Sequence, residues 1–265
     1  MQRSVSSHLV LDVERPALLA LLIAVAAGAY RTVESLSVTN DGRSLEVVDL
    51  RDRHGSRVHR VLAPEGRVEI DYRATVYGVD EPSPVDELDL IAYRRPSRYA
   101  DSDRMVGLAN VEFAGLSGEP LLQSVVQWVG GHVAYVSGSS GPTDGASDTL
   151  LSGQGVCRDF AHLTVSVLRA LDVPARLAAV YAPGLAPMDF HAVTEAYLDG
   201  RWCVVDPTHL APRSALLRIS TGRDAADTAF LSTHHGLVAL VEQEVTAVVD
   251  GELPTDDPLA LLSLR

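Results

Sequence analysis

The stretch GVCRDFAHL, residues 155–163, places a cysteine where a helix is expected to begin. A helix N-terminus carries a partial positive charge, which stabilises a thiolate relative to a thiol. Gly153 and Gly155 leave backbone amides free to face an oxyanion, and Arg158 adds positive charge nearby. Cys157 is therefore a candidate nucleophile, although free cysteine is also among the most commonly buried residues.

A base for this thiol is found downstream, in HAVTEAYLDGRWCVVDPT. The Asp-Gly pair in this stretch is typical of a two-residue hairpin turn, and it fixes the register of two antiparallel strands. That register makes His191 and Asp206 diagonal neighbours on one face, about 7–8 Å apart at their Cα atoms. An imidazole oriented by a carboxylate is the base that a cysteine nucleophile requires. Cys203 points to the opposite face and is expected to be a core thiol, which leaves Cys157 as the nucleophile.

Composition limits the partners and the compartment. The chain has 265 residues and a net charge of −13, which argues against binding a nucleic-acid backbone. Its two cysteines are too few for a disulfide framework and suggest a reducing compartment.

The apolar run over residues 17–30 is the one segment that resembles a targeting signal. It is shorter than the roughly 20 apolar residues of a membrane helix. Asp12 and Glu14 precede it, where a signal peptide would carry basic residues. We therefore expect a buried strand, no membrane partner and a cytoplasmic location, with a cleaved signal peptide as the less favoured alternative.

The elements that must position these residues divide the chain into three parts. Alternating apolar and polar residues with turn signals predict an antiparallel β-rich domain over residues 1–78. An acidic, proline-containing stretch opens a linker over residues 79–118. Helical periodicity predicts a core over residues 119–265, with the cysteine helix at 156–171. The Ser- and Gly-rich stretch at 137–155 fits a substrate-access loop and an ordinary surface connection equally well.

Three motifs resemble the bacterial transglutaminase-like superfamily: GVCRDFAHLTVSVLRALDVPARLAAVYA, DFHAVTEAYLDGRWCVVDPTH and STGRDAADTAF. The resemblance covers residues 119–230, and the preceding β-rich part is similar to a domain found before this core in many bacterial members. It implies an α+β fold, with an N-terminal antiparallel β domain followed by a papain-like transglutaminase core in which the cysteine helix packs on an antiparallel sheet.

The resemblance also implies the roles of the site residues. Cys157 is expected to be the nucleophile, His191 the general base and acid, and Asp206 the orienting carboxylate. Family members usually carry an aromatic residue where this chain has Val193, which affects the shape of the pocket.

The oxyanion and substrate cleft are assigned more loosely. Backbone amides from Gly155 through Val156 to the cysteine are expected to face the oxyanion. Trp128 and Tyr135 are candidates for a second donor, and His209 is a candidate lining residue of the cleft.

Other polar residues are expected to be structural. His162 lies about 140° around the helix from the cysteine, and Asp159 suits the first turn of a helix. Gln154 is too close to the cysteine in sequence to match the glutamine of papain-like proteases. The segment 222–227 fits a turn or an ion pair. Zinc-ligand spacing is lacking among His132, His209, His234 and His235, so no metal and no cofactor is expected.

These expectations combine into cysteine-dependent acyl transfer at an amide bond through a thioester, on a peptide or amide substrate. Hydrolysis by a protease or amidase is favoured. The alternatives are a protein-glutamine transglutaminase, a biosynthetic amide-forming acyltransferase, and a catalytically silent binding module.

Overall fold

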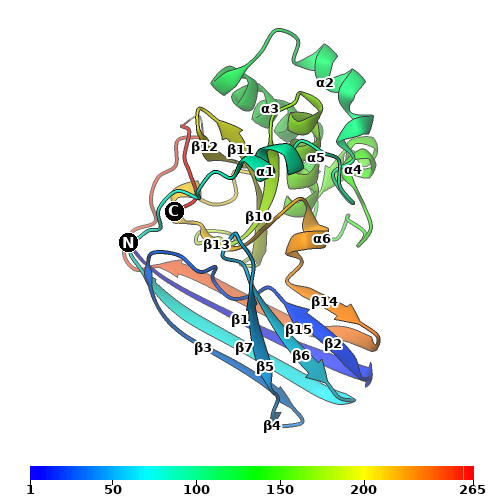
Figure 1. The fold of residues 1–265 in the computed structure, drawn as a ribbon, viewed down its shortest axis with the longest axis vertical. Helices are drawn as coiled ribbons and strands as arrows, with labels where there is room; N and C mark the ends of the chain where they lie inside the picture. Colours follow the sequence, from blue (N-terminus) through cyan, green and yellow to red (C-terminus); the bar gives the residue numbers. More distant parts are fainter. Residues whose placement is uncertain (259) are drawn as a thin grey trace.

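A computed structural model describes residues 1–258 and 260–265 of the chain. Strands outnumber helices, and the sheets are antiparallel apart from one short parallel pair. Figure 1 shows a β half below, coloured blue, cyan and orange, and a helical half above, coloured green and yellow. The predicted α+β class, with a helix packed on an antiparallel sheet, is confirmed.

Two sheets form the β half. The first has the order β15-β1-β7-β3-β4, with strands β1 (Gln2–Arg15), β3 (Arg31–Asn40), β4 (Arg43–Ser44), β7 (Gly66–Tyr77) and β15 (Leu237–Val249). The second has the order β14-β2-β6-β5, with β2 (Ala17–Leu21), β5 (Val47–Arg51), β6 (Arg57–Ala63) and β14 (Leu231–His234). Strands β14 and β15 come from the C-terminal part of the chain, so both ends of the sequence build this half.

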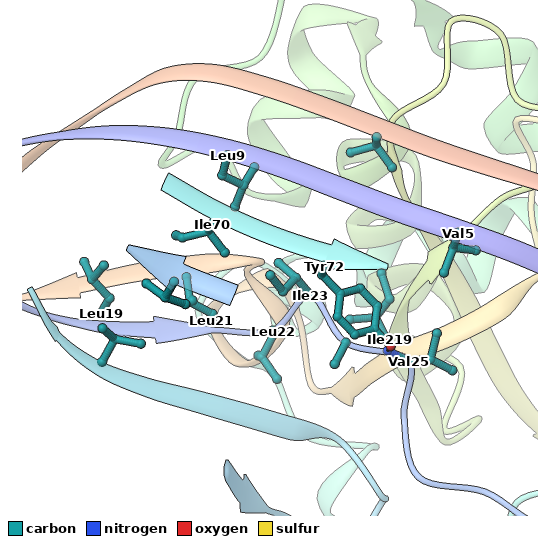
Figure 2. Packing of buried hydrophobic residues seen from close by; sticks show 14 of the residues in the cluster. Val5, Leu9, Leu19, Leu21, Leu22, Ile23, Val25, Ile70, Tyr72 and Ile219 are labelled. Carbon is teal, nitrogen blue, oxygen red and sulfur yellow. The ribbon is translucent and has the colours of Figure 1, made fainter. Parts of the chain in front are cut away.

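The core of the β half lies between these sheets. Residues alternate between buried and exposed along β7, as expected for a strand with one face on a core. Figure 2 shows Leu9 and Ile70 from the first sheet facing Leu19 and Leu21 from the second. The apolar run at 17–30 begins as β2, and residues 22–26 continue buried without regular structure.

A four-stranded sheet with the order β12-β11-β10-β13 carries the helical half. Its strands are β10 (Ala175–Tyr181), β11 (Phe190–Leu198), β12 (Arg201–Val205) and β13 (Leu217–Gly222). The helices are α1 (Glu87–Ala92), α2 (Val106–Glu112), α3 (Gly118–His132), α4 (Ala146–Ser152), α5 (Cys157–Ala170) and α6 (Ala225–Thr228), with short 3₁₀ turns at Ser102–Arg104 and Arg213–Ala215. Strands β8 (Ala134–Tyr135) and β9 (Gln154–Gly155) form the parallel pair.

Helix α5 is the central helix of this half, in contact with α2, α3, α4, β10 and β11. It begins at Cys157 and ends at Ala170, one residue inside each predicted boundary, because Val156 has extended backbone and Leu171 caps the last turn. Every residue from Asp159 to Arg169 is buried. No helix in the described part of the chain is long and apolar enough to cross a membrane.

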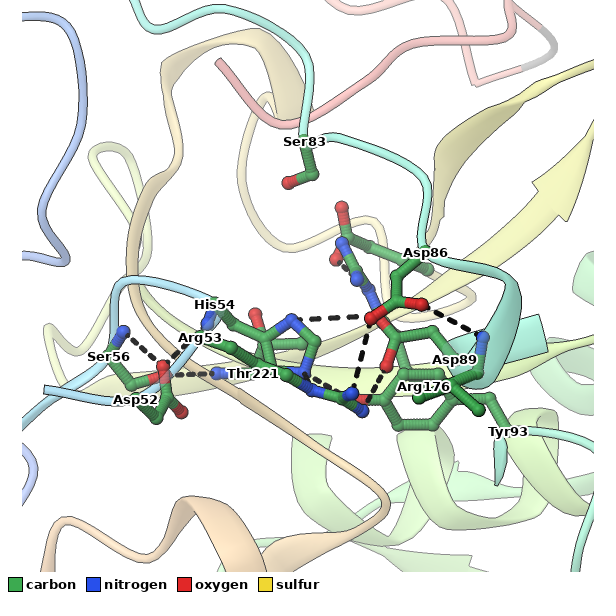
Figure 3. Close-up of polar contacts among 12 residues, drawn as sticks. Asp52, Arg53, His54, Ser56, Ser83, Asp86, Asp89, Tyr93, Arg176 and Thr221 are labelled. Carbon is green, nitrogen blue, oxygen red and sulfur yellow. Dashed lines mark hydrogen bonds and ion pairs between the residues drawn. The ribbon is translucent and has the colours of Figure 1, made fainter. Parts of the chain in front are cut away.

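A buried ionic cluster holds three strands of the sheet in place. Glu195 on β11 accepts hydrogen bonds from Arg176 Nε on β10 at 2.8 Å and from Arg218 Nη1 on β13 at 2.7 Å. Burial opposes ionisation, but the two guanidinium groups outweigh it and lower the pKa of Glu195 to about 2. Figure 3 shows the adjoining contacts, in which Arg53 from the β half reaches Asp86 and Asp89 beside α1. The contacts of Arg53 therefore link the β half to α1, and the Thr221 N–H on β13 donates to Ser56 Oγ of the β half at 3.2 Å.

Candidate active site

Cys157 is the first residue of α5 and is partly exposed. The turn before it is held by Asp159, whose Oδ2 accepts from the Val156 N–H at 2.8 Å and whose Oδ1 accepts from Ser140 Oγ at 2.9 Å. This confirms the expected first-turn role of Asp159. A Cβ on Gly155 would lie 2.6 Å from the Cβ of Asp159, so the turn requires glycine.

The capping bond has a consequence for the expected oxyanion site. The N–H of Val156 is already donated to a carboxylate, so it is not free to bind a substrate oxygen. Tyr135, which pairs with Gly155 in the β8–β9 pair, lines a cavity together with Cys157. Partial burial, with the nearby Cys157 side chain, raises the pKa of Tyr135 to about 12, so its hydroxyl remains protonated and able to donate. The structure thus brings one predicted donor, Tyr135, to the cysteine.

The structure places the other two cleft candidates elsewhere. Trp128 packs edge-on against Phe113 and stacks on His132 with ring centroids 4.2 Å apart, among the helices. His209 is exposed, although the adjacent Leu210 lines a cavity. Among the described residues, neither of the two cavities that meet at Cys157 is lined by Trp128 or His209.

His191 and Asp206 form a buried pair. Their Nε2 and Oδ2 atoms are 3.0 Å apart, as the hairpin register anticipates. The register itself is confirmed, because Leu198 pairs with Arg201 and Glu195 with Val204.

Asp206 is itself held in place after the end of β12. Its second oxygen, Oδ1, accepts from the Thr208 N–H at 2.9 Å and from Thr208 Oγ1 at 2.7 Å. Thr208 therefore orients the carboxylate, a role that the residue types around Asp206 did not predict.

The charges of the pair stabilise each other. Burial alone would lower the pKa of His191, but the carboxylate of Asp206 and the side chain of Cys157 outweigh it and raise this pKa to about 10. Burial conversely opposes ionisation of Asp206, and the imidazolium together with Thr208 lowers the pKa of that carboxyl. Because Nε2 is bound to Asp206, the buried Nδ1 is the ring nitrogen left to interact with the thiol. The surroundings of His191 thus favour the protonated form of its imidazole.

Two cavities meet at the cysteine, with volumes of about 250 Å³ and about 650 Å³. Both are lined by Cys157, Arg158, Asp189 and Phe190, and only the smaller is also lined by His191. The larger is also lined by Tyr135, Val156 and three residues of the Ser- and Gly-rich stretch, Ser137, Gly138 and Ser140. Asp189 and Phe190 were not singled out from the sequence, although they directly precede the predicted histidine.

The remaining predicted residues have structural positions. His162 is fully buried, burial lowers its pKa to about 3, and its Nε2 accepts from the Ala225 N–H at 3.1 Å. Asp224 caps α6, and Arg223 pairs with Asp227 at 2.8 Å, which confirms a turn and an ion pair at 222–227. Cys203 is completely buried, as expected of a core thiol.

Among the described residues, neither Val193 nor Gln154 lines the two cavities at Cys157. Val193 packs in an apolar cluster with Val180, Val204 and Leu216. Gln154 is exposed on β9.

Known proteins resemble this chain in sequence and in fold. The model of the family described as "Transglutaminase-like superfamily" matches residues 117–207, a range that contains Cys157, His191 and Asp206. A crystal structure from Cytophaga hutchinsonii, named as a candidate cysteine protease, is 33% identical with a TM-score of 0.88 and covers 98% of this chain and 96% of its own.

A curated relative matches a smaller part of the chain. An uncharacterized protein of Mycobacterium leprae (strain TN) is 30% identical over 118 residues. The match covers 40% of this chain and 41% of the length of that relative.

Proposed function

The chain belongs to the transglutaminase-like superfamily, and on that premise we propose that it is a cysteine hydrolase that cleaves amide bonds through Cys157, His191 and Asp206. The observation that carries the proposal is the position of His191, whose Nε2 contacts Asp206 at 3.0 Å while the ring lines the same cavity as Cys157, with its buried Nδ1 free of any hydrogen-bond partner among the described residues. A catalytically silent module would have no need of this buried charge pair, which has a desolvation cost.

The proposed reaction begins with the thiolate of Cys157 and the imidazolium of His191. The sulfur attacks the carbonyl carbon, and the carbonyl oxygen gains the negative charge. The N–H of Cys157 and the hydroxyl of Tyr135, which lines the larger cavity beside that cysteine, are the proposed donors to that oxygen. The C–N bond then breaks, His191 gives its proton to the leaving nitrogen, and a thioester remains on Cys157.

The second half of the reaction releases the acyl group. His191, now neutral, takes a proton from a water molecule as the water oxygen attacks the thioester carbonyl. The C–S bond breaks, which restores the thiolate and the imidazolium. Asp206 keeps the imidazole oriented and stabilises its positive form throughout.

Product analysis on a glutamine-containing peptide tests this function. The peptide is incubated with and without a primary amine, and products are identified by mass spectrometry. A cleaved backbone indicates a protease, and ammonia release without amine incorporation indicates an amidase. Amine incorporation in preference to hydrolysis overturns the hydrolase proposal in favour of a transglutaminase.

Two variants serve as controls. Cys157→Ala is expected to abolish all products, whereas Cys203→Ser is expected to retain them because that thiol lies in the core. If products persist in Cys157→Ala, the assignment of the nucleophile is wrong.

A further inference from the structure

The smaller cavity beside Cys157 is built by both halves of the molecule. Its apolar walls come from β10, β11, β13 and the segments after β2 and α6, through Leu22, Leu177, Ala179, Phe190, Ile219 and Phe230. The rings of Phe190 and Phe230 stack with centroids 5.0 Å apart and form one wall. Gln243 on β15 reaches the rim from the β half.

The charged residues at the rim are engaged with other partners. Arg158 Nη2 donates to Ser140 Oγ and to the Gly141 carbonyl oxygen, both at 2.6 Å. Asp189 Oδ1 accepts from the Phe190 N–H at 2.7 Å and from Gln243 Nε2 at 2.5 Å. Among the described residues that line this cavity, Arg158 and Asp189 are the charged ones besides Cys157 and His191.

Size and polarity together define what the cavity accommodates. At about 250 Å³ it is larger than the roughly 150 Å³ apolar cavity that holds a benzene molecule. It therefore has room for a side chain the size of leucine, methionine or phenylalanine. A charged or amide side chain would lose its hydration on entering and would find few hydrogen-bond partners on the apolar walls.

We infer that this cavity is a specificity pocket that takes one large apolar side chain of the substrate, close to the scissile amide. The inference rests on the proposed function, because it takes Cys157 as the attacking group. It adds a substrate class: peptides or amides with a bulky apolar group near the reacting carbonyl. The larger cavity has apolar lining from Leu185, Pro187 and Leu210 as well, but its serine and glycine residues make it the more polar of the two.

A series of small electrophiles tests the pocket without a known substrate. N-substituted chloroacetamides alkylate a thiolate: the sulfur bonds to the methylene carbon and chloride leaves. Isobutyl and benzyl tails are compared with carboxymethyl and aminoethyl tails by intact mass, each rate being divided by that of glutathione. We expect the apolar tails to react with Cys157 about tenfold or more faster than the charged tails.

Two lining variants locate the effect. Ala179→Leu places three more carbons in the pocket and is expected to remove most of the preference for apolar tails. Ala20→Leu is its matched control, because Ala20 is half-buried on β2 and lines none of the described cavities near the cysteine. Phe230→Ala enlarges the pocket and is expected to shift the preference towards a naphthylmethyl tail.

Plain iodoacetamide separates the two proposals. If it alkylates Cys157 no faster than free cysteine at pH 6, the activated nucleophile and hence the proposed function fail. If iodoacetamide reacts rapidly but the apolar tails give no advantage, the pocket inference fails alone. The inference also fails if Ala179→Leu and Ala20→Leu change the tail preference equally.

Discussion

The Nε2 atom of His191 lies 3.0 Å from Oδ2 of Asp206, and the side chains of the two residues are 0% and 2% exposed. At this depth the carboxylate interacts with the imidazolium with little screening by water. The carboxylate raises the pKa of His191 and so favours the protonated ring, which is the state required for a thiolate partner and for protonating a leaving amine.

Asp206→Asn is expected to shift the reactivity of Cys157 to higher pH. In the wild type the carboxylate of Asp206 raises the pKa of His191. Without that carboxylate, burial lowers this pKa, and the imidazolium that stabilises a thiolate is lost. The iodoacetamide rate at pH 6 should fall about tenfold or more. Asp227→Asn, which removes an exposed carboxylate paired with Arg223, should leave the profile unchanged. Identical profiles for the wild type and Asp206→Asn would contradict the charge pair.

The same pair makes folding stability depend on pH with a defined sign. The raised pKa of His191 stabilises the fold fully below the ordinary histidine value of about 6.5, and this contribution is lost as the pH rises to about 10. The lowered pKa of Asp206 stabilises the fold above the ordinary value of 3.8, and this stabilisation is lost as the pH falls below it. The free energies of unfolding of the wild type and Asp206→Asn, measured by urea denaturation, should therefore differ most between pH 3.8 and about pH 6.5. The difference should shrink towards pH 10.

Thr208→Val is expected to lower kcat about tenfold with a smaller change in KM. Valine keeps the shape of threonine but removes the hydroxyl that donates to Asp206 at 2.7 Å, so the carboxylate loses one of its two anchors. Thr208→Ser retains the hydroxyl and should restore the rate. If serine and valine behave alike, Thr208 does not act by positioning Asp206.

Gly155→Ala should destabilise the protein by about 1–3 kcal/mol, because the added Cβ would lie 2.6 Å from Asp159 Cβ, next to the nucleophile. Gly131→Ala is the matched control: its Cβ meets nothing within 4 Å in helix α3, so it should be neutral or slightly stabilising. Thermal or urea unfolding of the two variants measures the difference. Equal stabilities would show that the turn before Cys157 has room for a side chain.

Glu195→Gln should destabilise the fold by about 3–5 kcal/mol, because it leaves the guanidinium groups of Arg176 and Arg218 without their buried carboxylate. Glu69→Gln removes an exposed ion pair with Arg67 and should change the free energy of unfolding by about 1 kcal/mol or less. A small effect at Glu195 would mean that the two arginines find other acceptors or solvent.

Local chemistry in the sequence determined much of the site. The Asp-Gly turn fixed the register of β11 and β12, and that register put His191 and Asp206 on one face. Helical periodicity placed Cys157 at the start of α5 and pointed His162 elsewhere, and both positions are observed. These features could be predicted because each depends on residues close together in the chain.

Only the tertiary structure decided which groups surround the cysteine. Strand β15 pairs with β1 across nearly the whole chain, and this pairing brings Gln243 to the pocket that Leu22 also lines. The pairing of strands that are far apart in the sequence depends on how whole sheets pack. Neither segment alone carries a local pattern that identifies its partner. The surroundings of single groups were equally hidden: the Val156 N–H is taken by Asp159, and Tyr135 lines one cavity with Cys157, because side-chain positions within hydrogen-bond distance are set by the folded packing.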